Sequence, residues 1–105
     1  MIVTFEENYL RELYESGKTT DKKHRFQPEV IMKYKKRIST LLEADRVEDL
    51  FVIHSLNYEV LKGDKAGISS IRVDKQYRIE FTVSDNGLEP VITVCTILEL
   101  SNHYK

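Results

Sequence analysis

The chain has few of the residues that disulfides and metal centres require. It contains a single cysteine and no tryptophan among 105 residues, so a disulfide within the chain is excluded. Cys95 lies inside the apolar run VITVCTIL, which predicts a small buried hydrophobic side chain. The three histidines and the cysteine show neither HExxH nor CxxC spacing, so we expect neither a metal nor another cofactor.

Long apolar runs and nucleotide-binding glycine patterns are also missing. No run approaches the roughly 18 apolar residues of a membrane-spanning helix, and MIVTFEENYL lacks the basic region and apolar core of a secretory signal. We therefore expect a cytoplasmic protein. No Walker, dinucleotide or nucleophile-elbow motif occurs. With 41% apolar and 31% charged residues, the chain has the composition of a soluble globular protein and the length of one domain, residues 1–105.

What the chain does have is an uneven charge. Residues 18–37 hold eight lysines and arginines against Asp21 and Glu29, a charge of +6, and because the net charge is −1 the remainder carries −7. A basic segment of this kind is either a solvated face or a contact surface for an anionic partner. The acidic remainder favours a second partner of different charge.

The first part of the chain predicts a strand and a short helix. Residues 1–5 are rich in β-forming side chains. Apolar residues at helical spacing over residues 9–14 predict a helix that ends at Gly17. Residues 18–27 are charged and have no periodicity, so they predict a loop.

A longer helix follows this loop. Pro28 suits the first turn of a helix, and an apolar stripe over residues 30–42 leaves most of the lysines on other sides of it. Residues 46–53 predict a short helical or extended connector. Residues 60–67, with two glycines and two lysines, predict a loop.

The last third predicts antiparallel strands. Apolar residues alternate with polar ones over residues 70–73 and again over 77–81. Both apolar sets face one core only if the connection over residues 74–76 has an odd number of residues, since directly opposed residues share a face. Arg72 and Arg78 then share the opposite face. Two further segments complete the sheet, a turn over 84–90 and a central strand over 91–98.

Two arginines this close on a sheet repel each other unless a negative group lies between them. Opposed and diagonal neighbours are roughly 5 to 8 Å apart. One candidate is internal, because Glu80 lies on the same face and can pair with either arginine. The other is a phosphate, which suits the planar, bidentate guanidinium group. Lys62 and Lys65, on the loop just upstream, can reach the same region, and together these cations predict an RNA- or DNA-binding site.

At this point the residues resemble a family. The segment LKGDKAGISSIRVDKQYRIEF is similar to the pattern L-x-G-D-x-x-G-x-x-S-x-R-V-x-x-x-Y-R-I-x-F of HigB-type toxins in the RelE/ParE superfamily. The resemblance implies a RelE-like α+β fold, in which an N-terminal strand and two helices pack on a small, mainly antiparallel sheet. It also implies a ribosome-dependent mRNA endonuclease, the toxin of a type II toxin–antitoxin pair, inhibited by a helix-turn-helix antitoxin of the HigA kind.

RNA cleavage of this kind needs no metal. The 2′-hydroxyl attacks the adjacent phosphate, with a base near the hydroxyl, cations on the phosphate and an acid near the leaving oxygen. Arg72 and Arg78 are the predicted phosphate ligands, and Lys62 and Lys65 are predicted to add positive charge or hold flanking nucleotides. The basic segment is predicted to grip ribosomal RNA, and the residues chosen from it are Lys33, Lys36 and Arg37.

The proton-transfer groups depart from the family pattern. Many relatives end their last strand with Asp-Tyr-His, whereas this chain ends ILELSNHYK, so His103 and Tyr104 are the predicted counterparts in reversed order and further along. Relatives often have a histidine before Leu-x-Gly, and Glu59 occupies about that place here. His54 can substitute for that histidine only if the connector folds back, and it is otherwise a histidine without a function.

Two other functions stay open. On the same fold, ParE-like toxins inhibit DNA gyrase without cleaving anything, and the arginines would then serve folding or partner contact. The altered C-terminus is also compatible with an inactive relative.

Overall fold

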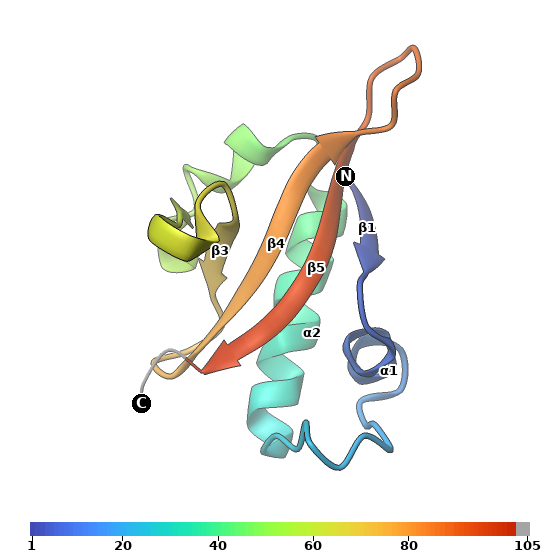
Figure 1. Cartoon of the computed structure of the whole chain (residues 1–105), viewed down its shortest axis with the longest axis vertical. Coiled ribbons are helices and arrows are strands. Elements are labelled where there is room, and N and C mark those ends of the chain that lie inside the picture. The colour runs from blue at the N-terminus through green and yellow to red at the C-terminus, as the bar shows by residue number, and fades with distance from the viewer. Residues whose placement is uncertain (103–105) are drawn as a thin grey trace.

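The structure is a computed structural model that describes residues 1–102. A five-stranded sheet forms its centre, in the order β1-β5-β4-β3-β2 (Figure 1). β1 (Ile2–Phe5) runs parallel to β5 (Thr93–Asn102), and the other pairs are antiparallel. The predicted N-terminal strand and mainly antiparallel sheet are therefore confirmed.

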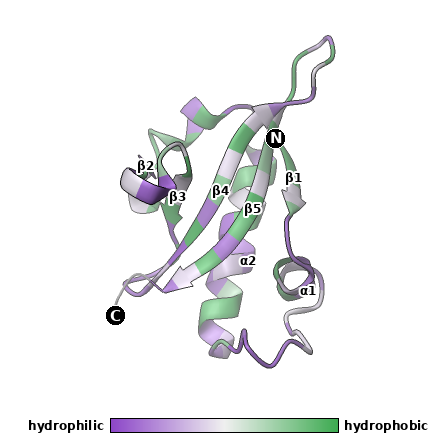
Figure 2. Cartoon of the chain, viewed as in Figure 1, coloured by the Kyte–Doolittle hydropathy of each residue, from purple (hydrophilic) through white to green (hydrophobic). Residues whose placement is uncertain are grey.

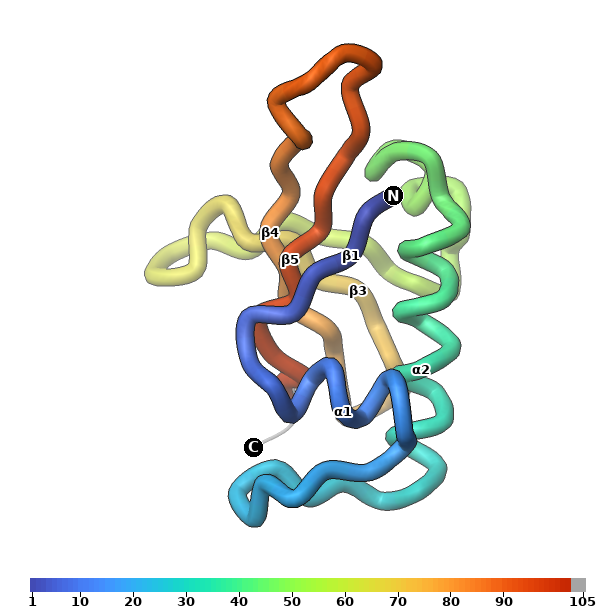
Figure 3. The backbone as a smooth tube through the Cα atoms, turned by 90° about the vertical axis from the view of Figure 1, so that its right-hand side faces the viewer, coloured from blue at the N-terminus to red at the C-terminus, as the bar shows by residue number. Residues whose placement is uncertain are grey.

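Two helices pack on one face of this sheet. α1 (Asn8–Ser16) ends at Gly17, whose positive φ of 75° suits glycine, and α2 (Pro28–Glu43) begins at the predicted proline. Figure 3 shows both helices on the same side of the strands. The face of the sheet turned away from the helices is called the open face below.

The core lies between the helices and the sheet. Apolar residues that alternate along the strands meet the stripe of α2, so that Tyr34, Ile38, Ile79 and Phe81 are each fully buried. Cys95 is also fully buried, as predicted, and burial raises the pKa of its thiol to about 11. Figure 2 shows hydrophilic and hydrophobic residues alternating along β4 and β5.

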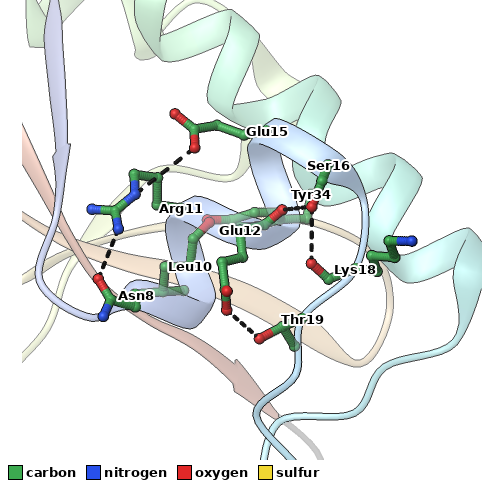
Figure 4. Close-up of polar contacts among 9 residues, drawn as sticks. All are labelled: Asn8, Leu10, Arg11, Glu12, Glu15, Ser16, Lys18, Thr19 and Tyr34. Carbon is green, nitrogen blue, oxygen red and sulfur yellow. Dashed lines mark hydrogen bonds and ion pairs between the residues drawn. The ribbon is translucent and has the colours of Figure 1, made fainter.

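The basic loop after α1 is held against α1 by polar contacts (Figure 4). Ser16 Oγ donates to the carbonyl oxygen of Lys18, at 3.1 Å, and Thr19 Oγ1 donates to Glu12, at 2.6 Å. Further along, the His24 ring stacks on Tyr9 with centroids 3.7 Å apart. The predicted loop over residues 18–27 is confirmed, and its path is fixed at both ends by α1.

The connection from α2 to the sheet consists of short elements. One-turn helices η1 (Val47–Leu50) and η2 (His54–Leu56) precede β2 (Glu59–Val60), and a third, η3 (Gly63–Lys65), precedes β3 (Ser69–Arg72). β2 was not predicted, because a two-residue strand leaves no alternation to detect. In Figure 3 the segment around residues 60–67 projects from the open face.

β4 (Tyr77–Asp85) and β5 form a long hairpin whose tip extends beyond the other strands (Figure 1). The predicted last strand was placed too early. It begins at Thr93 and lies between β1 and β4, while Val91 and Ile92 are exposed in the turn before it. No helix within residues 1–102 has the length and apolar character to cross a membrane.

Candidate phosphate-binding site

Arg72 and Arg78 are directly opposed on β3 and β4, as predicted from their alternation with core residues. The three-residue turn over 74–76 is closed by Asp74, whose side chain accepts from the backbone N–H groups of Gln76 and Tyr77, each at 2.8 Å. This turn sets the register, because it leaves Ile71 and Ile79 paired on the core side. Both arginines consequently extend from the open face.

The Arg78 guanidinium is fixed by three neighbours. Its Nε donates to Ser70 Oγ at 2.6 Å, and its Nη2 donates to the carbonyl oxygens of Asn57, at 2.7 Å, and Ser70, at 3.1 Å. A Glu59 carboxylate oxygen lies 3.6 Å from the same Nη2. Only 7% of the Arg78 side chain is exposed, so the group is held in one position instead of sampling solvent.

Burial has an electrostatic consequence for Arg78. Desolvation lowers the pKa of the guanidinium, while Glu59 raises it and Arg72 lowers it further. Arginine remains charged at neutral pH under such a shift because its ordinary pKa is far above 7. The site therefore holds a permanent, partly desolvated positive charge, whose Nη1 has no hydrogen-bond partner within residues 1–102.

Arg72 is arranged differently. Its side chain is exposed and its Nε donates to the carbonyl oxygen of Asp74 in the adjacent turn, at 3.0 Å. The Arg72 carbonyl oxygen accepts from Arg37 Nε, also at 3.0 Å, which brings a residue of α2 to the end of β3. Arg37, Arg72 and Arg78 thus connect the basic helix to the open face.

Glu80 pairs with neither arginine. Its two carboxylate oxygens accept from Lys65 Nζ at 2.9 and 3.1 Å, and this hydrogen bond is the main cause of a raised Lys65 pKa. The pairing of Glu80 with Arg72 or Arg78, considered from the sequence, is therefore wrong. Arg78 turns toward the β3 and β2 edge, and Lys65 reaches Glu80 from η3.

The other predicted site residues lie outside this cluster. Lys62 is exposed at the start of the 62–67 loop, and Lys33 and Lys36 are exposed on α2. These three ammonium groups make no hydrogen bond or ion pair with the rest of residues 1–102. His103 and Tyr104 lie outside the described residues, and β5 is described up to Asn102, opposite Tyr77.

Sequence analysis missed Asn57 and Ser70 as ligands of Arg78, and it did not pair Glu59 with this arginine. A backbone carbonyl leaves no mark in a sequence, so the Asn57 contact had no signal. Glu59 had a sequence signal, because it occupies the position at which relatives often have a histidine before Leu-x-Gly. We define the arginine site as Asn57, Glu59, Ser70, Arg72 and Arg78.

A pocket of about 550 Å³ adjoins the arginine site and shares two of its residues, Asn57 and Glu59. His54, on η2, lines this pocket as well. We call it the connector pocket, and its lining residues are Phe51, Ile53, His54, Asn57, Tyr58, Glu59 and Val60.

The arrangement can bind a phosphate next to a carboxylate. Arg78 supplies a fixed cation, Arg72 an exposed one, and Glu59, with 46% of its side chain exposed, supplies an oxygen that accepts protons. Within residues 1–102 there is no cluster of three or more histidine, cysteine, aspartate or glutamate side chains that could hold a metal ion.

Comparison with known protein families identifies the family to which the chain belongs. A family model described as the RelE-like toxin of the type II toxin–antitoxin system HigB matches residues 3–92. The chain belongs to the HigB-like toxin family. The match includes the arginine site and ends before β5, so the family assignment does not depend on the altered C-terminus.

Individual relatives agree with this assignment. Toxin HigB-1 of Vibrio cholerae serotype O1 is 37% identical over 82 residues, which cover 77% of this chain and 82% of that protein. A solved structure, the YoeB/ParE toxin from Agrobacterium tumefaciens, aligns with a TM-score of 0.60 over 99% of this chain and 100% of its own. At 21% identity that similarity shows the fold alone. The HigB-like chain is therefore a RelE-superfamily toxin with an antitoxin as partner.

Proposed function

We propose that the chain is a cytoplasmic endoribonuclease that cleaves mRNA on the ribosome and so inhibits translation. The observation that carries the proposal is the fixed Arg78 guanidinium, which is hydrogen-bonded to Asn57 and Ser70 with the Glu59 carboxylate beside it. A preorganised cation stabilises charge that develops on a phosphate without reorganising during the reaction. The family assignment is consistent with this chemistry.

The proposed reaction starts at the RNA 2′-hydroxyl. Its oxygen forms a bond to the adjacent phosphorus, its proton passes to Glu59, and the bond from phosphorus to the 5′-oxygen breaks. Arg78 and Arg72 bind the phosphoryl oxygens as negative charge accumulates on them. The leaving 5′-oxygen takes a proton from an acid, for which His103 is our candidate and Tyr104 the alternative. The products are a 2′,3′-cyclic phosphate and a 5′-hydroxyl.

Glu59 is the proposed proton acceptor because of its position. It is half-exposed, so a ribose can reach it, and it contacts the guanidinium that is proposed to bind the phosphate. The 2′-hydroxyl and the phosphate are neighbours on one nucleotide, so the groups that act on them have to be neighbours too.

The basic residues of α2 support a docking role. Lys33 and Lys36 lie on the exposed side of the helix, and Arg37 reaches β3. We propose that they bind ribosomal RNA while Lys62 holds nucleotides that flank the cleaved bond. Exposed lysines are suited to this role because phosphate attraction acts without precise geometry.

The test is to map transcripts after induction of the chain in a bacterium. Primer extension is expected to find cuts in phase with codons, and Glu59→Gln is expected to reduce cleavage about 100-fold or more, since general-base catalysis contributes about 10² to 10⁴. Glu43→Gln, which changes an exposed glutamate at the end of α2 outside the basic segment, is the matched control and should cleave like the unmodified chain. Cleavage by Glu59→Gln at the unmodified rate would reject Glu59 as the base.

A gyrase inhibitor is the second candidate, and the deep burial of Arg78 favours it, because such an arginine can serve folding alone. Uncut transcripts with an induced DNA-damage response would support this function. Normal growth during strong expression without antitoxin would instead indicate an inactive relative.

A further inference from the structure

The connector pocket contains an exposed aromatic ring that is held in place by other rings. Phe51 directly follows η1, and 53% of its surface is exposed. Its ring centroid lies 4.9 Å from that of Tyr58, which in turn lies 6.5 Å from that of the fully buried Phe81. The Tyr58 hydroxyl is hydrogen-bonded to Ser69 Oγ at 2.7 Å. Three rings thus run from the core to the surface, and Phe51 forms their exposed end.

The pocket also contains polar side chains without a partner. His54 and Asn57 line it, and their side chains make no hydrogen bond or ion pair with the rest of residues 1–102. An amide offers both donors and an acceptor, and a neutral imidazole offers one of each. The Asn57 backbone has a separate role, because its carbonyl oxygen accepts from Arg78 Nη2. An aromatic ring beside unpaired donors and acceptors is the combination that binds bases of single-stranded RNA.

The charge around the pocket determines which part of a nucleotide can enter it. Residues 47–60 contain Glu48, Asp49 and Glu59 and no lysine or arginine, so a phosphate is repelled here. The adjoining arginine site attracts a phosphate, and it shares Asn57 and Glu59 with the pocket. A base and its 3′-phosphate are joined through one ribose, so the sites that hold them have to adjoin. The pocket therefore suits an uncharged base whose phosphate lies on the arginines.

We propose that the connector pocket binds the base of the nucleotide whose 2′-hydroxyl attacks. The base stacks on Phe51, and the Asn57 amide and His54 imidazole make hydrogen bonds to its edge. This inference rests on the proposed function, in which Arg78 binds the 3′-phosphate of the same nucleotide and Glu59 accepts the proton of its 2′-hydroxyl. Stacking then positions the ribose, while the amide and the imidazole distinguish one base from another.

The experiment measures the binding of single nucleotides to the purified chain by NMR titration. The probes are the four nucleoside 3′-monophosphates and ribose 3-phosphate, which lacks a base. Each probe carries one phosphate, so it can occupy the arginine site in only one register. We expect the tightest-binding nucleoside 3′-monophosphate to bind at least about fivefold more tightly than ribose 3-phosphate, because stacking on an aromatic side chain contributes this much or more.

Three variants test the residues of the pocket. Phe51→Ala removes the ring and should lower this ratio to about one. Asn57→Gly removes the amide, but glycine suits the positive φ of 46° and keeps the carbonyl contact with Arg78. It should keep the preference for a base and change the order of affinities among the four bases. Val52→Ala is the matched control and should bind like the unmodified chain, because Val52 is adjacent, 78% exposed and outside the pocket lining.

The outcomes distinguish this inference from the proposed function. Equal binding of nucleotides and ribose 3-phosphate by the unmodified chain overturns the inference, and a pocket that serves a protein partner would give that result. A ratio that Phe51→Ala leaves unchanged, or that Val52→Ala lowers equally, also overturns it. Thermal unfolding of each variant shows whether a loss of binding reflects a loss of fold. Because the assay involves no cleavage, a chain that leaves transcripts uncut but shows the expected ratios loses the proposed catalysis and keeps the base site.

Discussion

Positive charge occurs in two regions of this protein, and the regions differ in how the charge is held. In the arginine site, Arg78 is nearly buried and has oxygen partners on Asn57, Glu59 and Ser70. In the basic segment 18–37, Lys33 and Lys36 are exposed and have no partner within residues 1–102. In the arginine site the guanidinium is held in a fixed orientation. The lysines of the basic segment instead produce an electrostatic field that extends into solvent.

This difference distinguishes the proposed catalytic role of the arginine site from the proposed RNA-attracting role of the basic segment. A reaction needs a cation within a few tenths of an ångström of its required position, which only packing and hydrogen bonds provide. Attraction of an RNA needs only net charge on one side of the molecule. The same residue types therefore serve different steps of the proposed function.

The largest expected effect is on stability and follows substitution of Arg78. Arg78→Ala removes three hydrogen bonds from a charged donor to acceptors on Ser70 and Asn57, so we expect the free energy of unfolding to fall by about 3 kcal/mol. Arg72→Ala should cost below about 1 kcal/mol, because its side chain is exposed and its contact with Arg37 is made by the backbone. Urea unfolding at neutral pH measures both. Equal losses would mean that the two arginines are held alike.

This result also decides how activity data are interpreted. Arg78→Ala is expected to lose cleavage and stability together, so it does not separate catalysis from folding. Arg78→Lys keeps the charge but loses the planar fork, and a folded Arg78→Lys protein without cleavage would assign the loss to phosphate binding. Full activity of that variant would contradict the proposed role.

A smaller effect is expected from the basic segment, and it concerns affinity alone. Lys33→Glu with Lys36→Glu should weaken binding to single-stranded RNA and lower the slope of log affinity against log salt by about 1.4, because each lost phosphate contact contributes about 0.7. Stability should change by less than about 0.5 kcal/mol. Fluorescence anisotropy over a salt series measures the slope.

The control for this experiment has the same change in net charge at other places. Arg11→Glu with Arg46→Glu alters two exposed arginines outside the segment, which pair only weakly with Glu15 and Asp49 at 3.8 and 3.9 Å. If this control lowers the salt slope equally, total charge and not the position of the basic segment determines RNA binding.

The comparison also explains how much the sequence could predict. Period-two alternation around Ile71 and Ile79 located the opposed arginines, because register follows from which side chains must be buried. Helical spacing and Gly17 located α1 for a similar reason. These features depend on local pattern, and local pattern is present in a single sequence.

The partners of Arg78 depend on tertiary structure and could not be predicted in this way. The Asn57 carbonyl and the Ser70 hydroxyl are common groups without a distinctive spacing, and β2 is too short to show alternation. Glu80 was a reasonable expectation as a partner, being two residues from Arg78 on the same strand. Glu80 pairs with Lys65 instead, because η3 places this long side chain within reach of the carboxylate.

Lys65 shares features of both the arginine site and the basic segment. The smallest expected effect concerns this residue. It is half-exposed, like the lysines of the basic segment, yet it is paired with a nearly buried carboxylate. A lysine whose pKa is raised in the folded state contributes stability that is complete below its ordinary value of 10.5 and is lost as the pH rises through the raised value. We expect a contribution of about 1 kcal/mol or less at neutral pH, because half of the lysine is exposed to solvent.

A double-mutant cycle of Lys65→Met and Glu80→Gln, measured by urea unfolding, gives this coupling energy. The same cycle repeated above the raised Lys65 pKa should show it vanish. Without Lys65, the charge of Glu80 faces Glu99 directly across β4 and β5. The stability losses of the two single variants should therefore sum to more than the loss in the double variant. A coupling energy of zero at neutral pH would mean that solvent cancels the ion pair. Lys65 would then be free to bind RNA, and its loss would affect the salt dependence of affinity as the lysines of α2 do.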